Sequence, residues 1–320
     1  MPDPADDAGA AGIGLLGGGA SDGVDFEQPG ERARRTTAHT AMSKRISLFS
    51  FIAIAAVIVA AAAVSAQQIW VGGGRFWRVP PKWAKAENFD GGFNFCRAYF
   101  SSDRREDGGT GWDTDFPGAD NNFSVRLGEL TKMPIKMDAR GQPDYVVVRL
   151  TDPLMARCMI VHFEDAGTIR MSPDEVQSLR AYLLKGGFIT VDDFWGSDAW
   201  TQWASEIQRV LPEYPIVDLP PDHPIMHTLY DVKEIEQVSS IQFWRRNGGS
   251  VSERAWQNDS PTVNVRGISD EQGRLMVLMA HNTDIPDTWE REGESQDYFE
   301  RFSPNGYAIG VNIVLYAYTH

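Results

Sequence analysis

The clearest pattern of apolar and polar positions lies at residues 159–195, where it predicts a strand, a helix and a second strand. The runs at 159–163 and 188–191 are mainly apolar, and each has the length of one strand. Residues 172–175 (SPDE) have the sequence of a capping box. Gly186-Gly187 suits the end of a helix. The apolar positions at helical spacing between these two signals are Val176, Leu179, Leu183 and Leu184.

A strand–helix–strand unit of this length predicts a parallel sheet with a right-handed crossover. Further strands are expected at 93–100, 145–150, 216–219, 263–268 and 275–280, and further helices at 120–131, 197–211 and 305–318. In the first of these helices, Phe123, Leu127 and Leu130 are expected to point inward. The turn sequence at 269–274 predicts a hairpin. The fold class is therefore α/β, with a flavodoxin-like sheet, helices on both faces and a small β-hairpin.

The first part of the chain has a different character. Residues 1–41 are rich in Ala, Gly and Asp without apolar periodicity, so they are either disordered or an extension upstream of a true start at Met42. A dinucleotide-type glycine pattern at 12–17 and a nucleophile-elbow pattern at 19–23 both occur here. Neither follows a strand or precedes a helix, so both are false positives.

Residues 42–66 predict a signal peptide or a membrane anchor. Two basic residues precede a continuous apolar run at 46–64, and Val64-Ser65-Ala66 has the small residues of a cleavage site before Gln67. The run is also long enough to span a membrane as one uncleaved N-terminal helix. Cleavage is the favoured reading. The chain is expected to be exported and periplasmic or secreted, or else anchored to the inner membrane, with a linker at 67–88 and the α/β domain at 89–320.

The net charge narrows the possible partners, and the cysteine content bears on disulfide formation. The formal net charge of −14 argues against binding to a phosphate backbone, so no nucleic-acid partner is expected. Cys96 and Cys158 are the two cysteines. They would be able to pair in an exported protein, but each is in or beside a predicted strand, which favours two free, buried thiols.

Polar side chains gather at the predicted strand ends, where ligands bind in open α/β sheets. They are His162, Glu164 and Asp165 on the first central strand, Asp192 and Asp193 on the second, and His281, Asn282 and Asp284 after the hairpin. Such groups can hold a divalent metal or perform acid–base catalysis. The favoured alternative is that the aspartates cap helices. With Val191 as the last buried strand residue, Asp193 is predicted to cap or orient the following helix, and Asp192 to face a cleft toward His162 and His281.

Two other groups of side chains have residue types that are common in binding or metal sites. Trp195, Trp200 and Trp203 offer flat faces for stacking on a sugar or peptide, although their helical spacing also suits a core. His223 and His227 are four residues apart, but prolines surround them and no Glu lies between them as in metalloproteases. A role in fixing a loop is therefore expected for these histidines.

Several of these segments together resemble the DUF4159 family, a domain of unknown function with a class I glutamine-amidotransferase-like fold. They are FNFCRAYF, SPDEVQSLRAYLLKGGFITVDDFWG, HPI, RGISDEQGRLMVLMAHNTDIPDTW and GVNIVLYAY, over residues 89–320. The resemblance implies an exported or membrane-tethered bacterial protein whose activity is unassigned. Neither cysteine is at a strand-to-helix elbow, so the glutaminase chemistry of the wider fold is not expected here.

The sequence therefore predicts a non-catalytic binding or assembly module of the cell envelope. Its expected partners are envelope proteins or a glycan or peptide ligand, with membrane contact only through residues 46–64 if they remain uncleaved. The alternative is a hydrolase or metal-dependent enzyme that uses Asp192, Asp193, His281 and Asp284 as ligands or acid–base groups. Whether these side chains converge in one pocket discriminates the two predictions. Carboxylates more than about 10 Å apart cannot share an ion, so scattered side chains would exclude the enzyme.

Overall fold

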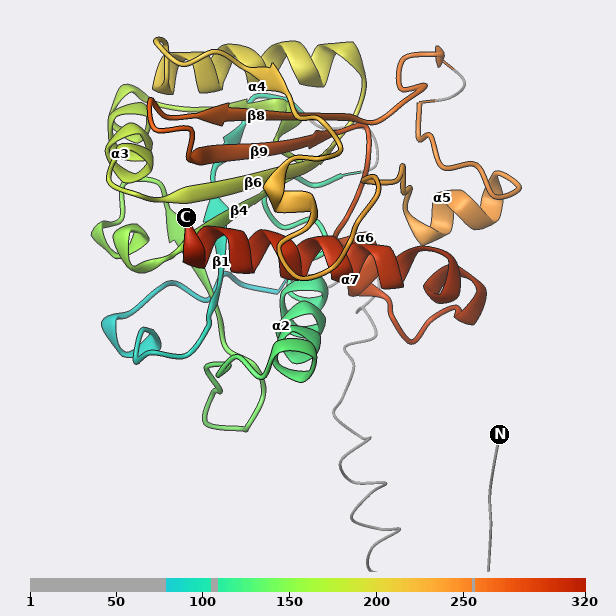
Figure 1. The fold of residues 1–320 in the computed structure, drawn as a ribbon, viewed down its shortest axis with the longest axis horizontal. Coiled ribbons are helices and arrows are strands. Elements are labelled where there is room, and N and C mark those ends of the chain that lie inside the picture. The colour runs from blue at the N-terminus through green and yellow to red at the C-terminus, as the bar shows by residue number, and fades with distance from the viewer. Residues whose placement is uncertain (1–78, 105–108, 255–256) are drawn as a thin grey trace, which may run out of the picture. The chain divides into compact units, whose positions relative to one another are not determined.

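A seven-stranded sheet organises the described part of the chain, and its strand order is β3-β1-β4-β6-β9-β8-β7 (Figure 1). The computed structural model describes residues 79–104, 109–254 and 257–320. The strands are β1 (Phe95–Tyr99), β3 (Tyr145–Arg149), β4 (Ile160–Glu164), β6 (Phe188–Phe194), β7 (Val217–Asp218), β8 (Asn264–Ser269) and β9 (Leu275–His281). A separate pair, β2 (Ser101–Ser102) and β5 (Ile169–Arg170), is antiparallel.

The first five strands in the sheet order are parallel, and β8 and β7 are antiparallel additions. Numbered along the chain, the parallel strands have the order 2-1-3-4-5, which is the flavodoxin-like arrangement. Its topological switch point lies between β1 and β4. The predicted α/β class, the parallel sheet and the β8–β9 hairpin are thus confirmed.

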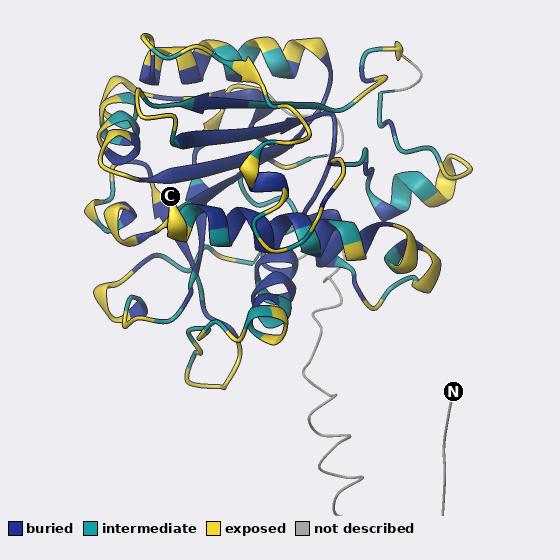
Figure 2. Cartoon of the chain, in the orientation of Figure 1, coloured by how far each residue is buried: buried dark blue, intermediate teal, exposed yellow. Residues whose placement is uncertain are grey.

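Helices cover both faces of the sheet. They are α2 (Gly118–Thr131), α3 (Pro173–Leu184), α4 (Gly196–Val210), α5 (Ile241–Arg246), α6 (Asp287–Glu290) and α7 (Gln296–Thr319), with short 3-10 turns at Ala86–Asn88, Pro153–Arg157, Ala166–Thr168 and Pro224–Met226. One core cluster joins α3 and α4 to the sheet, and a second joins α2 and α7. The central strands are buried throughout, whereas the helices have one buried and one exposed side (Figure 2).

Helix α3 follows its sequence signals closely. The Ser172 hydroxyl accepts a hydrogen bond from the Glu175 amide, and the Glu175 carboxylate accepts one from the Ser172 amide, which confirms the capping box. Leu179 and Leu183 are buried as predicted, but Leu184 is 42% exposed because it lies in the last turn, away from the sheet.

Two helices differ from the predicted ones. Helix α7 begins at Gln296 rather than at 305, because the Ser295 side chain caps it and Pro304 is tolerated inside it. Gly310 lets α7 lie close to α2, since a Cβ there would be 2.5 Å from the Phe123 ring. In α2, Leu130 was predicted to point inward but is 45% exposed, because the helix ends one residue later.

Strand β6 does not end at Val191 as predicted but continues to Phe194. Its pairing with β9 shifts register between Val191 and Phe194. Within this irregularity Asp193 has a positive φ of 51°. The two aspartates at this position therefore do not simply alternate between the two faces of the sheet.

The expectation of free cysteines was wrong, because Cys96 and Cys158 form a disulfide with a Cα–Cα distance of 6.1 Å. Cys96 lies in β1, and Cys158 lies just before β4, the strand next to β1, so the two side chains meet on one face of the sheet. Both remain buried, as expected.

Among the described residues, no helix combines the length and the apolar character that a membrane crossing requires. The apolar run at 46–64, the segment 1–41 and the predicted cleavage site all lie outside the described residues.

Candidate functional site

Buried acidic side chains converge at the carboxyl ends of the parallel strands, beside the switch point between β1 and β4. Register explains the convergence: Arg97 of β1 is level with His162 of β4, and Glu164 is level with Asp192 of β6. His162 and Glu164 are two residues apart, so both side chains point to the same face of the sheet. That face is the one covered by α2 and α7, since the Phe95 ring of the same core cluster contacts the His162 ring at 5.6 Å.

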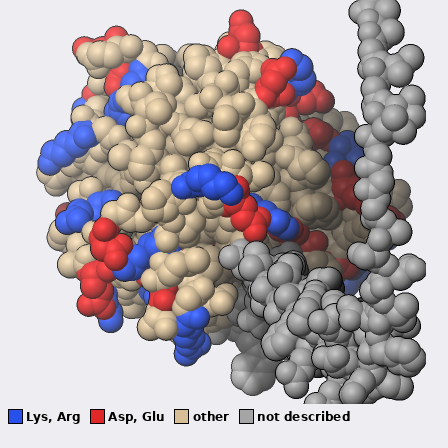
Figure 3. Space-filling model, turned by 60° about the horizontal axis from the view of Figure 1, so that its bottom comes forward, with Lys and Arg blue, Asp and Glu red and all other residues tan. Residues whose placement is uncertain are grey.

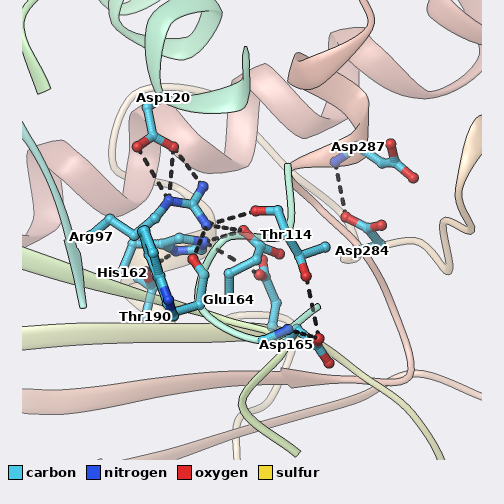
Figure 4. A network of polar contacts seen from close by, with 12 residues as sticks. Arg97, Thr114, Asp120, His162, Glu164, Asp165, Thr190, Asp284 and Asp287 are labelled. Atoms are coloured by element: carbon cyan, nitrogen blue, oxygen red, sulfur yellow. Dashed lines mark hydrogen bonds and ion pairs between the residues drawn. The ribbon is translucent and has the colours of Figure 1, made fainter. Parts of the chain in front are cut away.

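Arg97 is the cationic centre of this region (Figure 4). Its side chain is fully buried, and it donates three hydrogen bonds to Asp120 of α2, two from Nε and one from Nη2, which is 2.5 Å from Oδ1. On its other side Nη1 lies 3.3 Å from Oε2 of Glu164. Nη1 also donates to the carbonyl of Thr114 at 2.9 Å. Arg97 thereby fixes both the acidic helix α2 and the end of β4.

His162 lies between a hydroxyl and two carboxylates. Its Nδ1 is 2.8 Å from the Thr190 hydroxyl, and its Nε2 is 2.7 Å from Oε2 of Glu164. Oδ1 of Asp192 is 3.7 Å from the same Nε2. One ligand atom from each of His162, Glu164 and Asp192 lies within 4.8 Å of the other two, so these residues are able to share an ion.

A second set consists of Glu164, Asp193 and Asp284, whose ligand atoms also lie within 4.8 Å of one another. All three residues are buried. The chain brings Asp284 here directly after β9, where the Asp193 amide donates to the Thr283 carbonyl at 2.9 Å. Oδ1 of Asp193 accepts a hydrogen bond from the Trp195 indole at 2.9 Å. Within the described residues, Oε1 of Glu164 has no hydrogen-bond partner.

A third set extends the acidic region toward α6. Asp115, Asp284 and Asp287 again offer ligand atoms within 4.8 Å, and the Asp287 amide donates to Oδ1 of Asp284 at 2.9 Å (Figure 4). Burial, followed by the charge of Glu290, raises the pKa of Asp287 to about 8. The pKa values of Asp192, Asp193 and Asp284 are also raised well above the ordinary range, in each case first by burial and then by a neighbouring carboxylate.

The acidic side chains of this region lie inside the protein and not on its surface. On the face drawn in Figure 3, basic and acidic side chains lie beside one another in small mixed groups. Inside, Glu164, Asp192, Asp193 and Asp284 are each less than 9% exposed. Carboxylate oxygens are the preferred ligands of Mg²⁺, Ca²⁺ and Mn²⁺, and imidazole adds affinity for transition metals. The arrangement is therefore suited to divalent cations.

Some of the predicted cleft residues lie elsewhere. His281 was expected to face Asp192, but its ring lies on the α4 side, 5.0 Å from the Phe194 ring and 5.5 Å from the Trp200 ring. Its Nε2 is 2.9 Å from the Gly196 carbonyl. Burial lowers the pKa of His281 to about 4, and the charge of Arg266 acts in the same direction.

The capping role predicted for Asp193 was wrong, although Asp193 does bind the indole of Trp195 just before α4. Helix α4 begins after Trp195, and no side chain of the N-cap residue itself caps it. Its first amide, on Gly196, donates to Oδ1 of Asn282 at 2.8 Å. Asp193 is turned away by its positive φ and faces the carboxylates instead. Asn282, expected in the ligand cleft, therefore has the role expected of Asp193.

The remaining predicted residues have structural roles. Asp165 accepts a hydrogen bond from the Gly111 amide at 2.6 Å and so holds the loop before α2. Trp195 and Trp203 are 2% and 0% exposed, so they belong to the core and are unable to form a stacking surface. His223 caps the 3-10 turn at Pro224–Met226, which confirms the loop-fixing role expected for it.

Sequence reasoning missed Arg97, Asp115, Asp120 and Asp287. Arg97 left a usable signal in the sequence. It is the one charged residue of FNFCRAYF, and it alternates with Phe95 and Tyr99 on one face of the strand. Asp120 was assigned to a helix without a role. Asp115 and Asp287 lie in short loop and turn segments, where carboxylates are common and local pattern predicts no partner.

The fold and this site define a flavodoxin-like α/β domain with buried carboxylates at the switch-point edge of its sheet. The family model of DUF4159, a domain of unknown function, matches residues 101–318, and the chain belongs to this family. None of the curated proteins compared with the chain matches it.

Proposed function

We propose that this chain is a divalent-cation-binding module and that Glu164, Asp193 and Asp284 hold the ion. The observation on which this proposal depends is their convergence: three buried carboxylates from β4, β6 and the segment after β9 lie within 4.8 Å, and Oε1 of Glu164 has no hydrogen-bond partner among the described residues. A cation would give Oε1 of Glu164 the partner that the described part of the protein does not.

Electrostatics supports a cation over an empty acidic cluster. Two like charges about 4 Å apart repel by roughly 4 kcal/mol at the effective dielectric constant of a protein. Three such carboxylates have three repelling pairs, in addition to the penalty of burial. Protons remove this repulsion, as the raised pKa values indicate, and a divalent cation removes it without protonation.

The proposal places the module in the cell envelope of a bacterium, as an exported protein that is periplasmic, secreted or anchored by one N-terminal helix. The signal-like pattern at 42–66 supports export. The Cys96–Cys158 disulfide supports it too, since disulfides persist mainly in oxidising compartments. Envelope proteins, or a glycan or peptide ligand, are the proposed partners.

A metal-dependent hydrolase is the second candidate. The observation in its favour is the His162 imidazole, which lies beside Glu164 and Asp192 at the same edge of the sheet. An imidazole next to a bound ion is able to act as a general base toward a metal-bound water. His281, which the sequence had offered for this role, is on the other side of the sheet.

The proposal is tested by thermal unfolding of the full chain with EDTA and with Mn²⁺. A ligand present at 100 times its dissociation constant stabilises the folded state by about 2.7 kcal/mol, so Mn²⁺ should raise the melting temperature. Asp284→Asn should reduce the shift in melting temperature. Asp144→Asn is the matched control, because Asp144 is equally buried but is paired with Lys82 and Asn88. Equal melting temperatures with Mn²⁺ and EDTA for the wild-type chain would reject cation binding.

Export has a separate test. N-terminal sequencing of protein recovered from the envelope fraction should give a start at Gln67 if the peptide is cleaved. An intact start at Met42 in the membrane pellet would indicate an anchor. Soluble cytoplasmic protein that retains residues 46–64 would reject both forms of the proposal.

A further inference from the structure

Glu164 belongs to two of the three sets of potential ligands. It shares one set with His162 and Asp192 and another with Asp193 and Asp284. We infer that the site holds two divalent cations bridged by the Glu164 carboxylate, an inference that rests on the proposed cation binding. The first ion lies among His162, Glu164 and Asp192, and the second among Glu164, Asp193 and Asp284.

The two oxygens of Glu164 have different surroundings, as a bridging carboxylate requires. Oε2 is close to Nε2 of His162, at 2.7 Å, and to Nη1 of Arg97, at 3.3 Å. Oε1 is fully buried and has no hydrogen-bond partner among the described residues. A buried carboxylate oxygen without a donor is rare in folded proteins, and a cation is one of the few groups that satisfy it.

The surroundings of His162 provide a second, independent observation. The Thr190 hydroxyl lies 2.8 Å from Nδ1 and is able to accept a hydrogen bond from it. In the absence of an ion Nε2 donates to Oε2 of Glu164 at 2.7 Å, and in its presence the proton moves to Nδ1 and the lone pair of Nε2 becomes available to the metal. That nitrogen faces Glu164 and Asp192, and Oδ1 of Asp192 accepts no hydrogen bond from the described residues. Metal-binding histidines are oriented in this way, with the second ring nitrogen held by a polar neighbour.

The charge balance favours two ions over one. Glu164, Asp192, Asp193 and Asp284 have four negative charges when ionised, which two divalent cations neutralise. The guanidinium of Arg97 also contacts Glu164 at 3.3 Å, but its single positive charge is already balanced by Asp120, which accepts three hydrogen bonds from it. A single divalent cation would leave two uncompensated negative charges in a region where each of the four side chains is less than 9% exposed.

The two positions differ in ligand chemistry. The first has one imidazole nitrogen and two carboxylates, a set that transition metals prefer, and the second has carboxylates alone, a set that Mg²⁺, Ca²⁺ and Mn²⁺ accept. Mn²⁺ suits both positions. With both positions occupied, His162 would be a ligand and not the general base. Paired ions about 3.5–4 Å apart activate water in many hydrolases, so occupancy of both positions still favours a hydrolase over a binding module.

The test is a Mn²⁺ titration of the full chain after treatment with chelator, read by metal content after dialysis and by low-temperature electron paramagnetic resonance. The expected result is two Mn²⁺ per chain with the multiline spectrum of a coupled pair. One Mn²⁺ per chain with an uncoupled spectrum would overturn the bridged pair and leave the proposed function standing. No bound Mn²⁺ would overturn both.

Substitutions separate the two positions. His162→Gln and Asp192→Asn should each leave one uncoupled Mn²⁺, and so should Asp284→Asn on the other side. Glu164→Gln should remove the coupling whichever ions remain. The control Asp144→Asn should keep two coupled ions. If His162→Gln and Asp192→Asn both retain the coupled pair, the first position does not exist and the inference fails.

Discussion

His162 and His281 both lie near the carboxyl ends of parallel strands, yet their surroundings are opposite. His162 lies on the α2 and α7 face, between the Thr190 hydroxyl and two carboxylates. His281 lies on the α4 face, among aromatic rings and beside the guanidinium of Arg266. The sequence had assigned both to one cleft. The difference shows that a strand end brings a residue to the edge of a sheet, but the alternation along the strand decides which face it reaches.

The two faces of the sheet also differ in the charged side chains that a cation would meet. On the His162 side, carboxylates outnumber the one buried guanidinium, which is already paired with Asp120. On the His281 side, Arg266 lies over the Trp200 ring at 4.1 Å and repels a proton on the imidazole. A divalent cation should therefore bind on the first side and not on the second.

The largest expected effect is the loss of a buried guanidinium. Arg97→Met leaves Asp120 and Glu164 without their cationic partner, and it should lower the free energy of unfolding by about 3–5 kcal/mol. The matched change on the other side, Arg266→Met, should cost less than about 1 kcal/mol, because its carboxylate partner Asp218 is 83% exposed. Urea unfolding of both variants measures this, and equal losses would break the comparison.

The lowered pKa of His281 should make the stability of the chain depend on pH. Its pKa is about 4 in the folded chain and 6.5 in the unfolded chain, so the unfolded state takes up the proton first. The neutral His281 makes its full contribution to the free energy of unfolding above pH 6.5. This contribution declines as the pH falls toward 4, and the free energy of unfolding is then lower by roughly 3 kcal/mol. Asp259 and Arg266 are the charged groups that influence it.

The control is His281→Gln, measured in EDTA from pH 7 to pH 4. The carboxylates titrate equally in both proteins, so the difference between the two unfolding curves isolates the histidine. The difference in the free energy of unfolding between the wild-type chain and the variant should change by up to roughly 3 kcal/mol from pH 7 to pH 4. A difference that stays constant would mean that His281 is not shifted, and the contrast between the two histidines would weaken.

A smaller effect is expected at the start of α4. Asn282→Ala removes the acceptor of the Gly196 amide and should cost about 1 kcal/mol of stability, as the loss of a helix cap does. Asp193→Asn should leave stability in EDTA unchanged or raised, because it removes one of the mutually repelling carboxylates. Chemical denaturation of both variants in EDTA tests this. A larger loss for Asp193→Asn would restore Asp193 as the cap.

Much of the fold was predictable because local signals agreed with the tertiary structure. The capping box and the apolar stripe of α3 are both present, and the 269–274 turn joins β8 to β9. The ends of α7 were less predictable. Pro304 usually ends a helix, but here neighbouring packing, including the close approach at Gly310, outweighs that preference.

The site was predictable only in part. Glu164, Asp192, Asp193 and Asp284 were correctly expected at one edge, because parallel strands all end there. The positive φ of Asp193 and the register shift in β6 exist only through pairing with β9, so the exchange of roles between Asp193 and Asn282 had no local signal. The disulfide depended on β1 and β4 being neighbours, which is a matter of topology.

The central claim is that the carboxylates on the His162 side, and not the polar groups on the His281 side, bind a divalent cation. Isothermal titration of the full chain with Mn²⁺ at pH 7.5 tests it most directly, with Asp284→Asn and His281→Gln as the paired variants. The account predicts that Asp284→Asn weakens Mn²⁺ binding at least about tenfold, a loss of roughly 1.4 kcal/mol, while His281→Gln binds as the wild-type chain does. Equal Mn²⁺ affinity in Asp284→Asn and the wild-type chain, or a loss in His281→Gln alone, would contradict it.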